Sequence, residues 1–311
     1  MLTLEALQHK ISSGEDLLSV VKTMKAMAAV SIRQYEKAVE SAEAYFDTVE
    51  LGFRALFRRG RNIGDLIAGY QKTETTIVLA VGSDQGMCGQ FNERIFGLME
   101  NGLNELENEN QNLRVLAIGA KLSGLISSSD TELKQTFRAP ASIRTVSSTV
   151  EEILFYLSQV GSEVGIFSLH LYYNAKSSGS SYEPLHIMLL PFGLNYAENL
   201  REKGWQSDQI PSFRISSRQL LSSLTRQYMF AGLYRALAES LASENASRLA
   251  AMQAAEKNIE ERLKQYTTEY HHQRQESITS ELLDMVAGFE ALTGDDEDEE
   301  EDSDEDSVSG M

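Results

Sequence analysis

The stretch VGSDQGMCGQF, residues 81–91, carries the residue types of a phosphate-binding or nucleophilic site. It holds three glycines, a serine and the chain's single cysteine, and it directly follows TTIVLA, an apolar run that predicts a buried strand. A glycine-rich turn between a strand and a helix is where nucleotide-binding folds hold phosphate groups. A cysteine at such a turn can also serve as a nucleophile when a base activates it. Whether either chemistry is available depends on the spacing of the neighbouring residues.

That spacing does not match a phosphate site. A phosphate loop needs a lysine and a serine or threonine after its last glycine, and this chain has Gln90 and Phe91 there. The glycines at 82, 86 and 89 also miss the G-x-G-x-x-G spacing of a dinucleotide site. Gly86 and Gly89 are instead predicted to permit a tight turn between the strand and a following helix. No cofactor is expected there.

The cysteine and the histidines give little support to an enzyme. Cys88 has no histidine near it in the sequence, so it is predicted to be a small buried thiol, although folding could bring His170 or His186 to it. No metal site is expected, because none of the five histidines belongs to a cluster with metal-ligand spacing. They are His9, His170, His186, His271 and His272. An α/β enzyme that uses Cys88 is retained as one alternative.

The composition narrows the class of protein. The net charge of −18 argues against a nucleic-acid-binding protein, which needs clustered Lys and Arg to displace counterions. Eleven carboxylates lie in 295–306, and this acidic end, residues 293–311, is predicted to be disordered. A single cysteine fits a reducing compartment, and no apolar window is long enough to predict a membrane span. The N-terminus has acids and no continuous apolar core, so no signal peptide is expected.

Residues 1–62 are predicted to form one long helix. Steps of three and four from Leu4 to Leu56 pass through sixteen positions, and fourteen of them are apolar, so a single stripe faces a partner helix throughout. Gly14 and Lys25 are the two exceptions. They mark places where the helix bends or meets something other than its usual partner. Such a helix would be roughly 80 Å long, far more than an ordinary globular core requires.

Residues 217–292 are predicted to form a second long helix. No proline and only Gly232 and Gly288 occur between 218 and 292, and two heptad phases follow each other, shifted by one residue after Tyr270. Two long helices from opposite ends of one chain most simply pair as an antiparallel coiled coil. The rest of the chain is then inserted at one end of that pair.

The inserted residues 73–195 alternate strand and helix signals. TTIVLAV and LRVLAIG predict strands, each followed by a helical stretch, and the amphipathic helix VEEILFYLSQV precedes the strand candidates VGIFSLHLYY and PLHIMLL. This alternation predicts a largely parallel sheet, and residues 196–216 are predicted to be a loop. The expected fold class is α/β plus a long coiled coil, an antiparallel pair of long N- and C-terminal helices with an inserted Rossmann-like α/β domain.

Basic residues gather along one side of the first helix and leave two interpretations open. Lys22, Lys25, Arg33 and Lys37 fall mainly on that side. They could form an ordinary solvated face, or a charged track that touches an acidic partner. The spacing alone does not choose between the two.

Several stretches resemble the γ subunit of F-type ATP synthases, in the same order along nearly the whole chain. SENASRLAAMQAAEKNIEERL and RQESITSELLDMVAGFEAL look like the family's C-terminal signature, and SDQGMCGQFN looks like its Ser-Asp-x-Gly-Leu-Cys-Gly-x-x-Asn segment. The N-terminal helix resembles the family without gaps from Ile11 to Arg33. QYMFAGLY and RQESIT also resemble the divergent γ of the alternate F-type ATPase of some bacteria.

This resemblance implies a rotor that is not itself an enzyme. In the family, the two end helices form a shaft inside a catalytic hexamer of α and β subunits, and the Rossmann-like domain is a foot on the membrane ring of c subunits, beside the ε subunit. Flow of H⁺ or Na⁺ turns the foot, and the shaft drives each β subunit through different nucleotide affinities. The resemblance implies a peripheral subunit on the cytoplasmic side of a bacterial plasma membrane. It binds no cofactor, metal or nucleic acid and reaches the membrane only through the complex.

Positions that match the family's motifs imply the residues that contact β. Met24 and Lys25 stand where the shaft faces an acidic loop of β, and Arg248 belongs to the packing that supports this contact. Further positions fall where the upper shaft engages a catch loop of β. The expected coupling contacts are Met24, Lys25, Arg33, Arg248, Arg274, Gln275, Thr279 and Glu281.

The chain departs from the family pattern near this contact and at its end. Thr23 stands where the family usually has alanine, and Ser31 replaces a usual lysine. The family normally ends near Leu292, so the acidic end is additional. The alternative from a different class is a coiled-coil scaffold protein that carries a degenerate α/β domain and has no rotary role.

Overall fold

Two compact units make up the chain, Met1–Thr23 with Ala254–Met311, and Met24–Gln253. The two longest helices, α1 (Leu4–Arg59) and α7 (Ser217–Glu301), each contribute to both units. The computed structural model describes residues 3–59, 73–107, 112–177, 182–192, 194–203, 205 and 211–301. Within those ranges, no helix is both long enough and apolar enough to cross a membrane.

In the first unit, the two long helices run antiparallel and close together. The Lys10 ammonium lies 5.2 Å from the centre of the Tyr266 ring, and Gly14 faces Leu263, so residue numbers rise along one helix as they fall along the other. A Cβ added at Gly14 would lie 2.7 Å from Cδ2 of Leu263. Gly14 therefore interrupts the apolar stripe at a place where a side chain of the partner helix leaves no room for a Cβ.

The same antiparallel pairing continues in the second unit. Arg235 of α7 forms a 3.3 Å ion pair with Glu43 of α1, and a Cβ at Gly52 would lie 2.6 Å from Leu224. Positions of the predicted apolar stripe are buried in this unit, among them Ala28, Tyr35, Ala42, Val49, Phe53 and Leu56. The predicted antiparallel pair of long helices is confirmed.

The inserted domain contains a five-stranded sheet in the order β3-β2-β1-β4-β5. Its strands are β1 (Thr75–Val81), β2 (Asn112–Ile118), β3 (Leu133–Phe137), β4 (Phe167–Lys176) and β5 (Tyr182–Leu190). β1 pairs in parallel with β2 and β4, and β2 with β3, whereas β5 runs antiparallel to β4. Every residue of β1 is buried, as expected for the central strand of a sheet that is covered on both faces.

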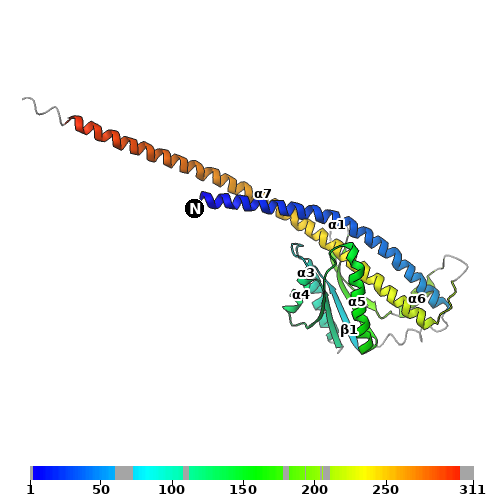
Figure 1. The fold of residues 1–311 in the computed structure, drawn as a ribbon. Helices are drawn as coiled ribbons and strands as arrows, with labels where there is room; N and C mark the ends of the chain where they lie inside the picture. Colours follow the sequence, from blue (N-terminus) through cyan, green and yellow to red (C-terminus); the bar gives the residue numbers. More distant parts are fainter. Residues whose placement is uncertain are drawn as a thin grey trace, which may run out of the picture. The chain divides into compact units, whose positions relative to one another are not determined.

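Helices cover both faces of this sheet (Figure 1). The helices α3 (Phe91–Glu107) and α4 (Ala120–Ser127) pack on the face to which Val78 and Ala80 of β1 point. The helix α5 (Ile143–Val164) covers the other face, where the core continues into α1 and α7. Because successive strand residues point to opposite faces, β1 supplies both layers. The sheet domain, β1 to β5 with α3, α4 and α5, thus shares a core with the long helices of its unit.

Two elements differ from the sequence prediction. The helix α6 (Leu194–Glu202) occupies the first part of the predicted loop 196–216 and begins two residues before it, because the buried Ala197 and Leu200, one turn apart, anchor a short helical segment to the core. The strand β3 was not predicted, since polar residues fill LKQTF between its two apolar ends and Phe137 alone is fully buried. Both elements are short and owe their structure to tertiary burial.

The ends of the long helices also differ from the prediction. The helix α7 continues to Glu301, into the region 293–311 that was predicted to be disordered. Glutamate is a good helix former and no proline stops the helix, so it propagates beyond its last apolar residues. The helix α1 ends at Arg59, and positions 60–62, like 302–311, lie outside the described residues.

Candidate functional site

The turn that follows β1, residues 82–90, is held to the sheet domain by side-chain hydrogen bonds. Backbone N of Ser83 donates to Oδ1 of Asn92 at 2.9 Å, and Oδ1 of Asp84 accepts from backbone N of Ala120 at 2.8 Å. Ala120 is the first residue of α4, so Asp84 satisfies an N–H group that has no partner within the helix. These polar groups are used in hydrogen bonds that hold the turn in place, as predicted for a structural turn.

Two residues of the turn have the left-handed conformation. Gly89 has φ 61°, as its predicted role in a tight turn requires, but the second such residue is Met87 with φ 57°, whereas Gly86 was expected. A Cβ at Gly89 would also lie 3.3 Å from Oγ of Ser247 on α7. Glycine at 89 therefore serves both the backbone turn and the approach of a helix.

Cys88 is a packed thiol, as predicted. Its side chain is 2 % exposed, and Sγ lies 3.7 Å from Oγ of Ser83. Burial raises the pKa of the Cys88 thiol above its usual value, so the group stays protonated near neutral pH and is a poor nucleophile. The two histidines that could have activated it bond to each other instead, with Nδ1 of His170 2.9 Å from Nε2 of His186.

The helix α7 meets the turn through two neighbouring side chains. Oγ of Ser247 donates a short hydrogen bond to the backbone carbonyl of Cys88. Nη2 of Arg248 donates longer bonds, 3.5 Å each, to the carbonyls of Gln85 and Gly86. Both side chains are buried. Three backbone carbonyls of the turn, those of Gln85, Gly86 and Cys88, are thereby bonded to one turn of α7.

A buried ion pair holds the arginine in place. Nη2 of Arg248 lies 2.6 Å from Oε1 of Glu244, and each side chain is 10 % exposed. Burial raises the pKa of the Glu244 carboxyl, and the neighbouring Arg248 partly opposes this effect. Among the described residues, Nε of Arg248 has no hydrogen-bond partner although it is buried. Removing either partner would leave an uncompensated buried charge.

A hollow of about 340 Å³ opens beside this ion pair. Side chains of α1, of the turn and of α7 line it, and they include Met24, Tyr35, Asp84, Glu244 and Arg248. Met24 and Arg248, two of the predicted coupling contacts, are thus brought to one place from opposite ends of the chain. Lys25 and Arg33 lie on α1 but do not line the hollow.

The other predicted contacts lie on α7 in the first unit. Arg274, Gln275, Thr279 and Glu281 are exposed, and the Thr279 hydroxyl donates to the Gln275 carbonyl at 2.8 Å. Large apolar side chains on the same stretch are also exposed, namely Ile278, Leu282, Leu283, Met285, Val286 and Phe289. A contiguous row of exposed apolar groups is typical of a surface that binds another chain.

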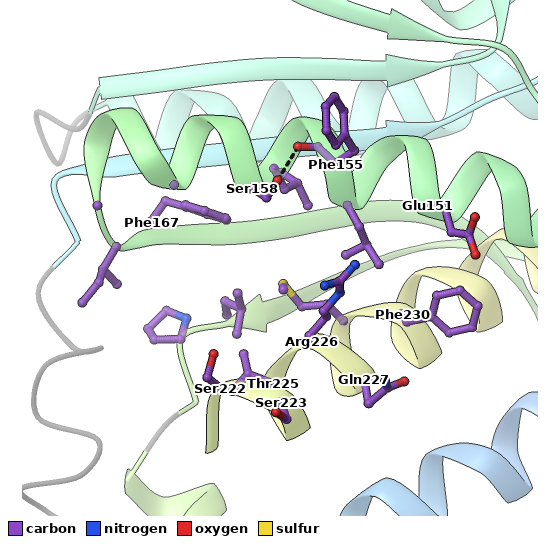
Figure 2. Close-up of a pocket in the computed structure, with 18 residues that line it drawn as sticks. Glu151, Phe155, Ser158, Phe167, Ser222, Ser223, Thr225, Arg226, Gln227 and Phe230 are labelled. Carbon is purple, nitrogen blue, oxygen red and sulfur yellow. Dashed lines mark hydrogen bonds between the residues drawn. The ribbon is translucent and has the colours of Figure 1, made fainter. Parts of the chain in front are cut away.

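A larger groove, of about 1030 Å³, lies between α5 and α7 (Figure 2). Its walls carry apolar rings such as Phe167 and Phe230 and hydroxyls such as Ser158, and Arg226 extends from α7 toward α5. Phe155 at its edge is 65 % exposed. No group of three potential metal ligands occurs here or elsewhere in the described parts of the chain. Because apolar and polar side chains both occur in its lining, the groove suits a chain or ligand of mixed polarity.

The sequence comparisons decide the family. The pattern of the family described as ATP synthase matches residues 3–292. The chain belongs to the ATP synthase family. An ATP synthase gamma chain of Magnetococcus marinus is 27 % identical over 298 residues, covering 94 % of this chain and all of that relative. An ATP synthase gamma chain of Brucella ovis is 25 % identical over 302 residues with the same coverage.

Solved structures of family assemblies share the fold. A chain of the Euglena gracilis mitochondrial ATP synthase rotor aligns with a TM-score of 0.57 at 18 % identity, covering 88 % of this chain and 98 % of that one. A chain from a second structure of the same enzyme, with F1 and the c ring, gives 0.58 at 16 % identity, covering 99 % and 98 %. By its family, its relatives and its fold, the chain has a central-stalk role.

Sequence reasoning found the separate parts of the site but not their contact. It singled out the turn, Met24 and Arg248, yet Ser247 and Cys88 are 159 residues apart in the chain. No local pattern in the sequence predicts that Ser247 lies against the backbone carbonyl of Cys88. The spacing of Glu244 and Arg248, four residues apart on one helix, is a signal of an ion pair that the sequence does contain.

Proposed function

We propose that this chain is the rotor, the γ-type subunit, of an F-type ATP synthase or ATPase. In this role it couples ion flow through a membrane c ring to ATP synthesis or hydrolysis at β subunits. The observation that carries the proposal is the antiparallel pairing of α1 and α7 in both units, in a chain whose family match spans residues 3–292. The sheet domain, which is inserted between these two helices, would be the part that is turned. The α1–α7 pair would be the part that contacts the β subunits.

The proposed mechanism needs no bond chemistry from this chain. A rotor changes nucleotide affinity only if it contacts the β subunits differently at each angle, because coupling requires a differential interaction with the states of the partner. Each β subunit would meet a different side of the α1–α7 pair as it turns. We therefore propose a non-catalytic subunit that acts through its surface.

A first group of contacts with β is proposed at Met24, Lys25 and Arg33 of α1, supported by Arg248 of α7. Met24 is partly exposed at the rim of the smaller hollow, and the buried ion pair of Arg248 supports that rim from within. A basic and apolar surface there would suit an acidic loop of β.

The substitution Met24→Lys tests this contact. It adds a charge beside Lys25, so in the assembled complex ion pumping should fall by a larger factor than ATP hydrolysis. Val30→Lys is a matched control on the same helix, at a side chain that is 61 % exposed and does not line the hollow. If both activities were retained equally in Met24→Lys, the proposed contact would be wrong.

A second group of contacts with β is proposed on α7, at Arg274, Gln275, Thr279 and Glu281. Their side chains are exposed on the stretch of α7 that also exposes its large apolar residues. A polar set that can donate and accept hydrogen bonds, surrounded by apolar groups, suits a close-fitting collar formed by the α and β subunits.

The remaining partners follow from the same proposal. The sheet domain would bear on the c ring and the ε subunit, and the chain would lie at the cytoplasmic side of a bacterial plasma membrane as a peripheral component. The coupling ion, H⁺ or Na⁺, would be chosen by other subunits. The resemblance to the alternate F-type ATPase of some bacteria remains part of the proposal.

Co-purification tests the proposal against the scaffold alternative. With an affinity tag on this chain, α and β subunits encoded in the same genome should be recovered with a single copy of the chain in each hexamer. A scaffold would be recovered without them. If the hexamer assembled with another γ-type subunit while this chain purified alone, the rotor proposal would fail.

A further inference from the structure

Torque exchanged between the sheet domain and the shaft must pass through whatever joins them. The chain connections on either side of the sheet domain provide one path, and the apolar core that this domain shares with α1 and α7 provides another. Side-chain bonds between the turn 82–90 and α7 provide a third path, and these bonds are directional. To transmit torque, the turn must be held rigidly by the sheet domain, and Ser247 and Arg248 must be held rigidly by α7.

On the side of the sheet domain, the turn is anchored at its start. The Ser83 backbone and side chain both engage Asn92 at the beginning of α3, with Nδ2 of Asn92 2.9 Å from Oγ of Ser83. Asp84 is bonded to the first residue of α4. The turn is therefore tied to β1, α3 and α4 together, so it moves only if the sheet domain moves.

On the side of the shaft, the bonding groups are buried and oriented. Ser247 and Arg248 are 7 % and 8 % exposed, and Glu244 fixes the guanidinium at 2.6 Å. Hydrogen bonds in such a water-poor place are not exchanged for bonds to solvent when they are strained. Gly89 lets α7 come this close, because any larger residue would crowd Oγ of Ser247.

We propose that the turn 82–90 is a hydrogen-bonded joint through which the sheet domain and α7 exchange torque, and that Ser247 and Arg248 are its positioning residues. This inference rests on the proposed rotor function. The glycine-containing strand-to-helix corner presents its carbonyls to a helix of the same chain. Its backbone binds the shaft where a nucleotide-binding protein would bind phosphate.

Ser247 is the cleaner residue to test, because Arg248 is also a proposed contact behind the β-facing surface. Ser247→Ala removes the hydroxyl that donates to the Cys88 carbonyl. Ser243→Ala is a matched control, since Ser243 lies one turn earlier on α7, is 2 % exposed, and its hydroxyl has no hydrogen-bond partner among the described residues. Ser247→Thr keeps a hydroxyl and serves as the conservative rescue.

The experiment uses the whole complex in inside-out membrane vesicles. ATP hydrolysis and ion uptake are measured together, H⁺ by a pH-sensitive dye and Na⁺ by radioactive sodium, while the opposing ion gradient is raised. Ser247→Ala should assemble and hydrolyse ATP as the parent does, but it should lose pumping at a smaller opposing gradient. Ser243→Ala should behave as the parent, and Ser247→Thr should recover most of the loss.

Two outcomes would overturn the joint while leaving the rotor intact. Ser247→Ala could pump against the same gradient as the parent, in which case the bond carries no load. Alternatively, Ser247→Ala and Ser243→Ala could lose pumping equally, or lose assembly, in which case the hydroxyl matters only for packing. If the parent chain itself failed to enter the hexamer, the proposed function would fail first and the joint with it.

Discussion

Gly89 has two separate reasons to be a glycine. Its φ of 61° is unfavourable for residues with a Cβ, and a Cβ there would lie 3.3 Å from Oγ of Ser247. Neither reason is visible in the sequence VGSDQGMCGQF, where the glycines first suggest phosphate binding. The structure shows that the turn leaves room for a helix.

Gly89→Ala should therefore lower the unfolding free energy by about 1–2 kcal/mol, through backbone strain and crowding of the α7 contact. Urea unfolding of the purified chain, followed by far-ultraviolet circular dichroism, measures the change. The matched control is Gly97→Ala, in the middle of α3 with nothing within 4 Å of the added Cβ, which should stabilise by about 0.5–1 kcal/mol. Equal effects of the two substitutions would contradict this account of Gly89.

His170 and His186 form a neutral pair across β4 and β5. Their rings are stacked at 5.1 Å, and the Tyr172 ring stacks on His186 at 4.5 Å. Burial, with a smaller contribution from His186, lowers the pKa of His170 to about 4. Burial also lowers the pKa of His186, while the charge of Glu105 on α3 opposes that shift. One N–H donor and one acceptor suffice for the bond between the rings, so the neutral forms fit.

This pair should make the chain less stable in acid. Since the ordinary pKa of histidine is 6.5 and that of folded His170 is about 4, the unfolded chain binds more protons between these pH values. The unfolding free energy should fall by up to about 3 kcal/mol as the pH drops through this window. His170→Gln should flatten the dependence, whereas His272→Gln, at an exposed position, should not. Denaturant melts at several pH values test this, and a parent chain with no loss between pH 7 and pH 4 would refute it.

At the scale of elements, the long helices were predictable because one repeating pattern specifies them. Fourteen apolar positions in phase fix the buried face of α1, and a long proline-free run fixes α7. The strand β1 was also predictable, since a run of apolar residues bounded by turn residues is typical of a strand buried on both faces. Patterns that repeat or stay uniform over many residues need no knowledge of the rest of the fold.

Short elements and long-range contacts were not predictable, because they depend on parts of the fold that are distant in the sequence. The strand β3 and the helix α6 hold too few apolar residues for a pattern, and each exists because the rest of the fold covers Phe137 or Leu200. The contact of Ser247 with the turn depends on the register of α7 against the sheet domain. A single hydroxyl among many serines gives no signal of that register.

The pairing of α1 with α7 should depend on its buried aromatic residues. Phe53 is fully buried, with its ring 5.1 Å from that of Phe192 and 6.0 Å from that of Tyr228. Phe53→Ala should lower the unfolding free energy by about 3–5 kcal/mol, because it removes buried area and leaves a cavity. Met27→Ala, at an exposed position of the same helix, should change it by less than about 0.5 kcal/mol. Similar losses in urea unfolding would show that the described burial of α1 is wrong.

At the scale of the whole molecule, the chain combines a body with a covered sheet and two long helices that leave apolar surface exposed. Apolar clusters cover both faces of the sheet, and the cluster on the α5 side is shared with α1 and α7. In contrast, α7 exposes Ile278, Leu282 and Phe289 to solvent in the isolated chain. Such a division suits a part whose exposed helix is held by other subunits while its sheet domain is turned. We expect this body to rotate when the hexamer hydrolyses ATP.

Single-molecule observation of that rotation tests the claim most directly. Phe155→Cys introduces an exposed thiol on α5, and the native Cys88 is buried, so a biotin label and a bead can be attached to the sheet domain alone. With the hexamer fixed to a surface, we expect ATP to drive the bead in continuous rotation in one direction. A bead that stays still, or only fluctuates about one angle while the same complex hydrolyses ATP, would contradict the account.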